Sequence, residues 1–176
     1  MSKFLKGKMG FNKTLLMAAK LHKVFVYGTL KKQEPNHHWF SKDNIGYHKF
    51  ICDAETIQKY PLIIGTRYNI PFLLYSPGVG SHVKGEVYEV DDRVLSNLDI
   101  LEDHPNYYIR EQHTIKCLDG RGDSIEAWIY FIKNFKPDLL KQQMFENYSS
   151  NGSHGLQYVA RYDRDQNYNV KSDILL

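Results

Sequence analysis

The sequence has little cysteine, no long apolar run and no acidic residue in its first 32 positions. Its two cysteines, Cys52 and Cys117, are far apart and outside any C-x-x-C spacing. A fold that depends on disulfides is therefore not expected, and reduced thiols in a cytoplasmic protein are predicted. No stretch approaches 18 consecutive apolar residues, so no integral membrane helix is expected.

The positive charge of the chain is concentrated at its front. Residues 1–32 carry eight lysines and no acid, so residues 33–176 hold 15 basic and 20 acidic side chains. The formal net charge of +3 therefore hides a mildly acidic body. Binding of the body to nucleic acid loses its main electrostatic support, and no nucleic-acid partner is expected.

Residues 1–22 are interpreted as a basic N-terminal extension. The stretch mixes lysines with scattered apolar residues, as an organelle presequence does, but such peptides favour arginine, which is absent here. A solvated tail is the preferred interpretation, and a mitochondrial targeting segment is the alternative.

Several familiar catalytic motifs are missing. The sequence contains no H-E-x-x-H, no Cys/His quartet, no P-loop, no G-x-G-x-x-G and no G-x-S-x-G. A metal site, a nucleotide site of these types and serine hydrolase chemistry are therefore unsupported.

From residue 23 onward, short β-like runs alternate with turns, which predicts a mainly β domain. One helix is clear: it starts at Asp91 or Asp92 and carries apolar residues at helical spacing before Pro105. A second short helix is predicted over 138–145. The predicted strands are 24–27, 45–56, 61–65, 72–75, 83–90, 107–118 and 124–132. The expected fold is α+β, a single domain with a curled mixed sheet or small β-barrel and flanking helices.

Glu102 stands out in the helical pattern. It follows Leu98 by four residues and Leu95 by seven, so it prolongs the apolar stripe. A carboxylate at the edge of an apolar face is desolvated, which raises its pKa towards the range of a general base. Alternatively, Glu102 turns to solvent or pairs with Arg110, and Glu86 is a competing candidate.

Residues 27–30 (YGTL) end a buried strand with glycine and threonine. Successive backbone N–H groups at such a strand end can form a nest for a carboxylate or an oxyanion. A strand followed by glycine is more often a simple turn, so this pattern alone does not establish a site.

Residues 24–31 (VFVYGTLK) resemble the opening signature of the gamma-glutamylcyclotransferase-like superfamily, and further segments narrow the resemblance to its gamma-glutamylaminecyclotransferase branch. The resemblance spans about 23–165, in order and without large gaps. The supporting segments are 33–37 (QEPNH), 60–64 (YPLII), 69–74 (NIPFLL), 85–88 (GEVY), 98–102 (LDILE) with Pro105, Tyr108 and Arg110, and 154–158 (HGLQY).

The resemblance implies a cofactor-independent enzyme that releases 5-oxoproline and a free amine from a small gamma-glutamyl amine, such as the gamma-glutamyl-lysine isopeptide. It assigns Glu102 as the general acid and base. It places Tyr27, Gly28, Thr29 and Leu30 in a loop that holds the glutamyl group. Ile70, Pro71 and Tyr108 are expected to be further substrate contacts.

Two alternatives remain open at this point. One is a cyclotransferase for gamma-glutamyl amino acids or glutathione, although such enzymes usually carry Tyr-Gly-Ser in the loop. The other is a catalytically idle member of the family that serves as a binding or interaction module. The expected domain is 23–165, followed by a C-terminal tail at 166–176. The oligomeric state is not determined, with a monomer slightly favoured.

Overall fold

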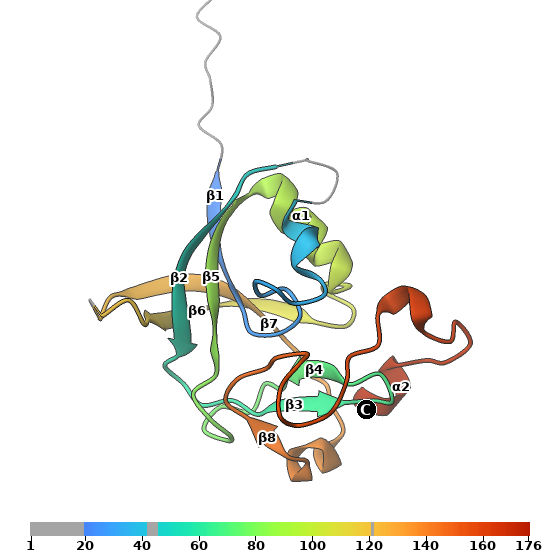
Figure 1. Ribbon diagram of the computed structural model, residues 1–176. Helices are drawn as coiled ribbons and strands as arrows, with labels where there is room; N and C mark the ends of the chain where they lie inside the picture. Colours follow the sequence, from blue (N-terminus) through green and yellow to red (C-terminus); the bar gives the residue numbers. More distant parts are fainter. Residues whose placement is uncertain (1–19, 42–45, 121) are drawn as a thin grey trace, which may run out of the picture.

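A closed barrel of five strands forms the body of the protein (Figure 1). The computed structural model describes residues 20–41, 46–120 and 122–176. In order around the barrel the strands are β1 (Leu21–Val26), β5 (Lys84–Asp91), β2 (His48–Thr56), β6 (Ile109–Cys117) and β7 (Ser124–Phe131). Neighbouring strands are antiparallel except where β1 meets β7, which it pairs in parallel at Val24 and Trp128 to close the barrel.

A second, smaller sheet lies below the barrel in Figure 1. It consists of β4 (Ile70–Leu73), β3 (Leu62–Gly65) and β8 (Met144–Phe145). The helix predicted over 138–145 is wrong. A 3-10 helix, η3 (Pro137–Lys141), occupies its first half, and Met144 and Phe145 pair with β3 instead. These long-range backbone hydrogen bonds outweigh the local helical preference.

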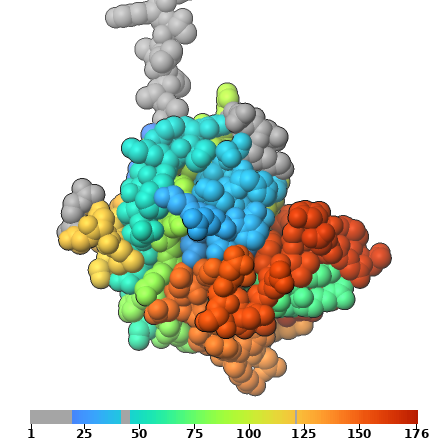
Figure 2. Space-filling model, in the orientation of Figure 1, coloured from blue at the N-terminus to red at the C-terminus, as the bar shows by residue number. Residues whose placement is uncertain are grey.

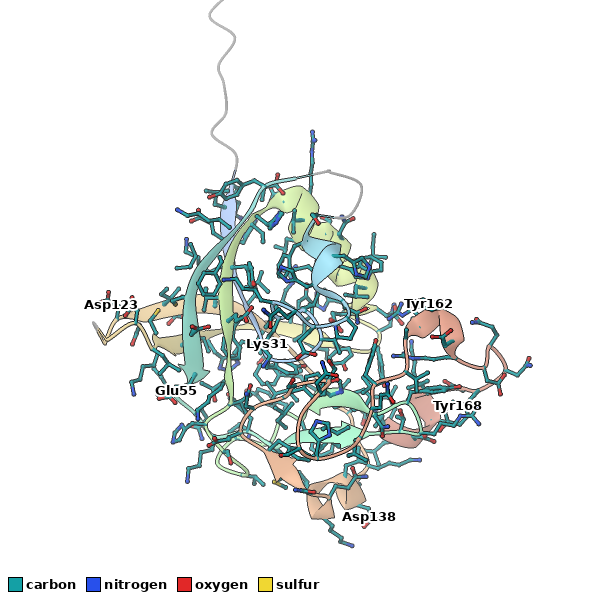
Figure 3. The ribbon with its side chains drawn as sticks, in the orientation of Figure 1. Lys31, Glu55, Asp123, Asp138, Tyr162 and Tyr168 are labelled. Atoms are coloured by element: carbon teal, nitrogen blue, oxygen red, sulfur yellow. The ribbon has the colours of Figure 1, made fainter. Side chains whose placement is uncertain are left out.

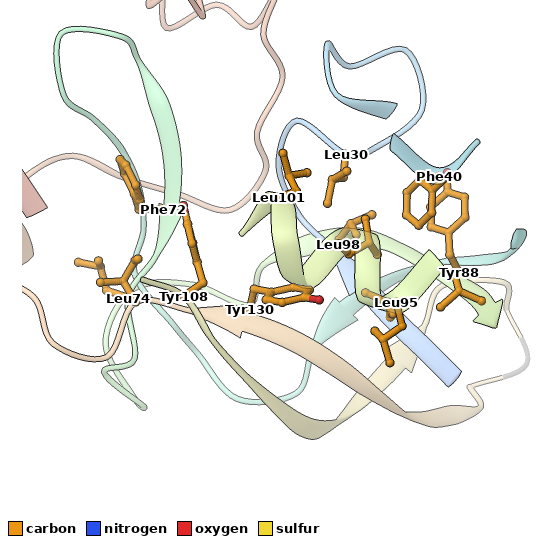
Figure 4. Close-up of a cluster of buried hydrophobic side chains, with 14 of the residues drawn as sticks. Leu30, Phe40, Phe72, Leu74, Tyr88, Leu95, Leu98, Leu101, Tyr108 and Tyr130 are labelled. Carbon is orange, nitrogen blue, oxygen red and sulfur yellow. The ribbon is translucent and has the colours of Figure 1, made fainter. Parts of the chain in front are cut away.

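The predicted central helix is present as α1 (Asp92–Leu101). Asp91 is its N-cap, and Asp91 Oδ1 accepts a hydrogen bond from the amide of Val94 at 3.0 Å. The apolar stripe faces the barrel, where it packs with the 3-10 helix η1 (His37–Phe40) (Figure 4). The buried residues of the stripe are Val94, Leu95, Leu98 and Leu101.

Successive side chains of β1 and β5 point alternately into two hydrophobic cores. On β1, Phe25 belongs to the cluster that draws residues from all five barrel strands, while Val24 and Val26 belong to the cluster under α1. On β5, Val87 belongs to the first of these clusters and Tyr88 to the cluster under α1. Both faces of these two strands are therefore buried, which fixes their register and the position of the loop that follows β1.

The C-terminal residues pack onto the domain. The sequence suggested a tail at 166–176, but Ile174, in the short helix α2 (Lys171–Ile174), is fully buried, and Leu175 pairs with Phe135. At the other end, β1 begins at Leu21, two residues before the predicted domain. The predicted extension at 1–22 lies mostly outside the described residues, which begin at 20.

Cys52 of β2 and Cys117 of β6 are free, buried thiols whose Sγ atoms are 2.7 Å apart. Burial and the neighbouring thiol raise the pKa of Cys52 to about 12, so it is protonated at neutral pH. Among the helices in the described ranges, none combines the length and the apolar character that crossing a bilayer requires.

Candidate active site

A cavity of about 530 Å³ opens where four parts of the chain meet. They are the C-terminal end of α1, the loop after β1, the start of β4 and the segment 158–171. Figure 2 shows the C-terminal part, in orange and red, against the blue segment that follows β1. All of the residues predicted to form the site line this cavity: Tyr27, Gly28, Thr29, Leu30, Ile70, Pro71, Glu102 and Tyr108. The structure thus brings them together, while their chemical roles stay predictions.

Glu102 is the carboxylic acid of the cavity lining whose pKa is raised, whereas the pKa values of Asp103 and Asp165 are lowered by their hydrogen bonds and ion pairs. Its side chain is half-buried, and burial raises its pKa to about 7, from an ordinary value of 4.5. The positive charge of Arg161 partly opposes this rise. At neutral pH the group is therefore divided between its acid and base forms, as a proton-transfer catalyst requires.

The end of α1 sets the direction of Glu102. The helix ends at Leu101, and Glu102 is its C-cap with φ −86° and ψ 0°, close enough to helical geometry to keep the side chain on the stripe. The next residue, Asp103, has φ +49°, which turns the chain away from the helix. The amide of Tyr108 then donates to the carbonyl of Glu102 at 3.3 Å.

The alternative placements of Glu102 are not observed. Arg110 pairs with Asp99, at 3.0 Å from Nε to Oδ1, and Asp99 also accepts a 2.6 Å hydrogen bond from Tyr130. Glu86 lies outside the cavity lining and accepts hydrogen bonds from the amide of Lys32 at 2.9 Å and from Tyr88 at 2.7 Å. Arg110, the alternative partner of Glu102, and Glu86, the alternative candidate base, are thus both engaged in other contacts.

The loop after β1 contributes four residues, 27–30, to the lining of the cavity. The amide of Asn36 donates to the carbonyl of Thr29 at 2.9 Å, and that of Lys31 to the carbonyl of Gly28 at 3.1 Å. Within the described ranges, the amides of Gly28, Thr29 and Leu30 have no hydrogen-bond acceptor. Unsatisfied N–H groups beside a cavity are suited to bind a carboxylate or an oxyanion.

Side-chain contacts hold this loop in place. Lys31, near the centre of Figure 3, is buried and donates to Asn147 Oδ1 at 2.7 Å and to the carbonyl of Tyr148 at 2.5 Å. Tyr27 donates from its hydroxyl to the carbonyl of Tyr130 at 2.8 Å. The loop is therefore anchored on both sides of residues 28–30.

Pro71 forms the wall nearest to this loop. A Cβ added at Gly28 would lie 2.9 Å from Pro71 Cγ, so glycine allows the loop and the wall to approach. Tyr108 donates from its hydroxyl to the carbonyl of Pro71 at 3.4 Å and stacks on Phe72, with ring centroids 6.2 Å apart.

Several cavity residues are not predictable from the sequence alone. Asn36 donates from Nδ2 to Thr29 Oγ1 at 2.9 Å and to the Tyr158 hydroxyl at 3.0 Å, and so connects the loop to the C-terminal segment. Both lie in segments that carry the family resemblance (33–37 and 154–158), which was the available signal. Arg161 and Arg164 gave no such signal, because their proximity to Glu102 and Tyr158 depends on the fold. The additional lining residues include Asn36, Tyr107, Tyr130, Tyr158, Arg161 and Arg164.

Comparisons with known proteins agree with this architecture. The profile of the family described as "Gamma-glutamyl cyclotransferase, AIG2-like" matches residues 24–150. Gamma-glutamylaminecyclotransferase C of Danio rerio is 47% identical over 146 residues, covering 81% of this chain and 96% of that protein. Gamma-glutamylaminecyclotransferase of Mus musculus is 39% identical over 146 residues, covering 80% and 98%. The crystal structure of an AIG2-like protein from Mus musculus superposes with a TM-score of 0.77 at 39% identity, covering 82% of this chain and 99% of that one.

Proposed function

Because the chain belongs to the gamma-glutamyl cyclotransferase, AIG2-like family, we propose that it is a gamma-glutamylaminecyclotransferase. The resemblance seen in the sequence and the α+β barrel fold are both confirmed by these relatives. The substrate in this proposal is a small gamma-glutamyl amine, and the products are 5-oxoproline and the free amine.

One observation carries the proposal. A carboxyl group whose pKa is about 7 lies in the same cavity as a loop with unsatisfied backbone amides. The first can move protons at neutral pH, and the second can stabilise a negatively charged oxygen. Both are needed for attack of an amine on an amide carbonyl.

The reaction needs little beyond geometry and proton transfer. Ionised Glu102 removes a proton from the substrate's α-ammonium, and the free amine attacks the γ-carbonyl carbon to form the carbon–nitrogen bond of a five-membered lactam. The amides of residues 28–30 stabilise the oxyanion of the tetrahedral intermediate. Collapse breaks the bond to the leaving nitrogen, which is protonated by Glu102.

In total, two protons leave the α-nitrogen and both end on the leaving amine, which departs as an ammonium ion. Glu102 carries them in turn and is ionised again at the end. Because the nucleophile is part of the substrate, holding it in the attacking geometry can contribute about 7–11 kcal/mol. The chemistry therefore balances with the groups of the substrate and one carboxylate.

The test is Glu102→Gln, with release of 5-oxoproline and lysine from the gamma-glutamyl-lysine isopeptide as the readout. Loss of a positioned acid and base is expected to lower kcat by about 10²–10⁴-fold. Glu55→Gln makes the same chemical change at a surface carboxylate paired with Lys116 and is expected to leave turnover unchanged. Near wild-type turnover by a folded Glu102→Gln variant would contradict the assignment.

Substrate comparison separates this function from the alternatives. The isopeptide, gamma-glutamyl-alanine and glutathione are offered to the wild-type enzyme side by side, and the isopeptide is expected to have the highest kcat/KM. A preference for gamma-glutamyl-alanine or glutathione would favour the related cyclotransferases. Binding of 5-oxoproline with no turnover of any of the three would indicate a catalytically idle member.

A cytoplasmic location is part of the proposal. It rests on the sequence, which has only two cysteines and no C-x-x-C spacing. Imaging of the full chain with a C-terminal fluorescent label tests it. Accumulation in mitochondria would instead support the targeting interpretation of the lysine-rich front.

A further inference from the structure

Arg164 is a cation of the cavity without an acidic partner. It lines the cavity, is half-buried, and has no carboxylate oxygen within 4 Å among the residues that the structure describes. Two acids of the cavity lining are already paired, Asp165 with Arg67 at 3.1 Å and Asp103 with Lys171. A guanidinium in such a place is suited to bind an anion that enters the cavity.

The protein holds this guanidinium in one orientation. Arg164 Nε donates to the carbonyl of Val159 at 3.0 Å, and its guanidinium carbon lies 5.2 Å and 5.4 Å from the ring centroids of Tyr158 and Tyr68. These contacts occupy Nε and the faces of the guanidinium plane, and they leave its two terminal nitrogens for a ligand. A planar, pre-oriented guanidinium matches the two oxygens of a carboxylate.

Arg164 and Arg161 make different contacts in the cavity. Arg161 donates to the carbonyl of Leu101, next to Glu102, and its charge acts on that carboxyl, whereas Arg164 is placed over Tyr158. The glutamyl group is assigned to the Tyr27–Leu30 loop and Glu102, so the segment carrying Arg164 is left for the leaving amine.

We propose that Arg164 binds a carboxylate of the leaving amine and thereby selects its class. The gamma-glutamyl-lysine isopeptide of the proposed function offers such a carboxylate, because the flexible four-carbon stem of lysine separates the reacting nitrogen from the α-carboxylate. Simple alkylamines lack the charge that Arg164 recognises. This inference rests on the proposed function and assigns a specificity-determining residue to it.

Three substrates with the same gamma-glutamyl group test the inference. Their leaving amines are lysine, 6-aminohexanoate, which keeps the carboxylate but lacks the α-amine, and hexylamine, which lacks both. In Arg164→Gln, kcat/KM for the first two is expected to fall about 10- to 100-fold, the range of a lost charged hydrogen bond. For hexylamine it is expected to change less than twofold, which also shows that the variant is folded.

Two further variants control for charge and shape. Arg164→Lys keeps the charge but loses the fork, so a smaller loss, confined to the two carboxylate substrates, is expected. Arg93→Gln removes the same charge from the exposed face of α1 and is expected to change none of the three rates.

An equal loss on all three substrates would overturn the inference, because it would mean that Arg164 only supports the fold or holds the glutamyl group. Unchanged rates on all three would overturn it as well. Failure of the proposed function looks different, since wild type would then turn over none of the three.

Discussion

Arg161 donates a 3.1 Å hydrogen bond from its guanidinium to the carbonyl of Leu101, the last residue of α1 and the neighbour of Glu102. A cation at the C-terminal end of a helix satisfies an unpaired carbonyl and interacts favourably with the helix dipole. Here it also acts on the carboxyl of Glu102, whose pKa it lowers against the effect of burial. The C-terminal segment thus influences the group that we propose as the acid and base.

Arg161→Gln is expected to shift the pH profile of the enzyme. Without the positive charge, the pKa of Glu102 rises above about 7, so a smaller fraction is ionised at neutral pH. The acid limb of kcat/KM, where activity rises with pH as Glu102 ionises, therefore moves to higher pH. Arg161→Lys keeps the charge and is expected to move it less. An acid limb that stays in place in Arg161→Gln would show that this charge does not tune the base.

Glu102→Gln is expected to stabilise the fold at alkaline pH. The folded-state pKa of Glu102 is about 7 against 4.5 for the unfolded chain, so the folded state favours the protonated form. That contribution is complete below pH 4.5 and is lost as pH rises to about 7. Glutamine does not ionise, so the variant avoids the loss, which amounts to at most about 3 kcal/mol.

Denaturant unfolding of both proteins at pH 4.5 and pH 8 measures this effect. The free energy of unfolding of the variant should exceed that of wild type only at the higher pH. The same difference at both values would mean that glutamine stabilises the site by packing and not by removing a charge. A stability gain that accompanies lost turnover is the usual trade-off where a protein keeps a charge in a desolvated site.

Local sequence pattern predicted α1 and most of the barrel strands because these signals lie within each element. The N-cap at Asp91 and the spacing of Leu95 and Leu98 are visible without the fold. The strand at Met144 and Phe145 is not visible in this way, because it forms only by pairing with β3, which lies about 80 residues earlier.

The candidate site likewise combines features that local sequence pattern predicts with contacts that only the fold shows. Periodicity placed Glu102 on the buried stripe but left its partner open, and only the fold shows Arg110 committed to Asp99. The contact of Asn36 with Tyr158 joins residues 122 positions apart, and the arginines near the end of the chain reach the cavity through packing of the same segment. Such contacts follow from tertiary structure and have no short-range pattern.

Gly28→Ala is expected to damage turnover while the protein still folds. The added Cβ would lie 2.9 Å from Pro71 Cγ, closer than real Cβ contacts, so the loop must shift, because the proline ring yields little. Overpacking of this kind costs about 1–3 kcal/mol, and the shift also displaces the amides of Thr29 and Leu30. We expect kcat/KM to fall by about tenfold or more, since small errors in positioning slow catalysis strongly.

A compensating change shows whether that contact is the cause. Pro71→Ala removes Cγ and Cδ, so in the double variant Gly28→Ala/Pro71→Ala the new methyl group has space again. The double variant is expected to recover part of the kcat/KM lost in Gly28→Ala, giving a positive coupling between two sites that touch. Additive losses would place the effect of Gly28→Ala in the loop backbone itself, and wild-type turnover in Gly28→Ala would remove this loop from the proposed mechanism.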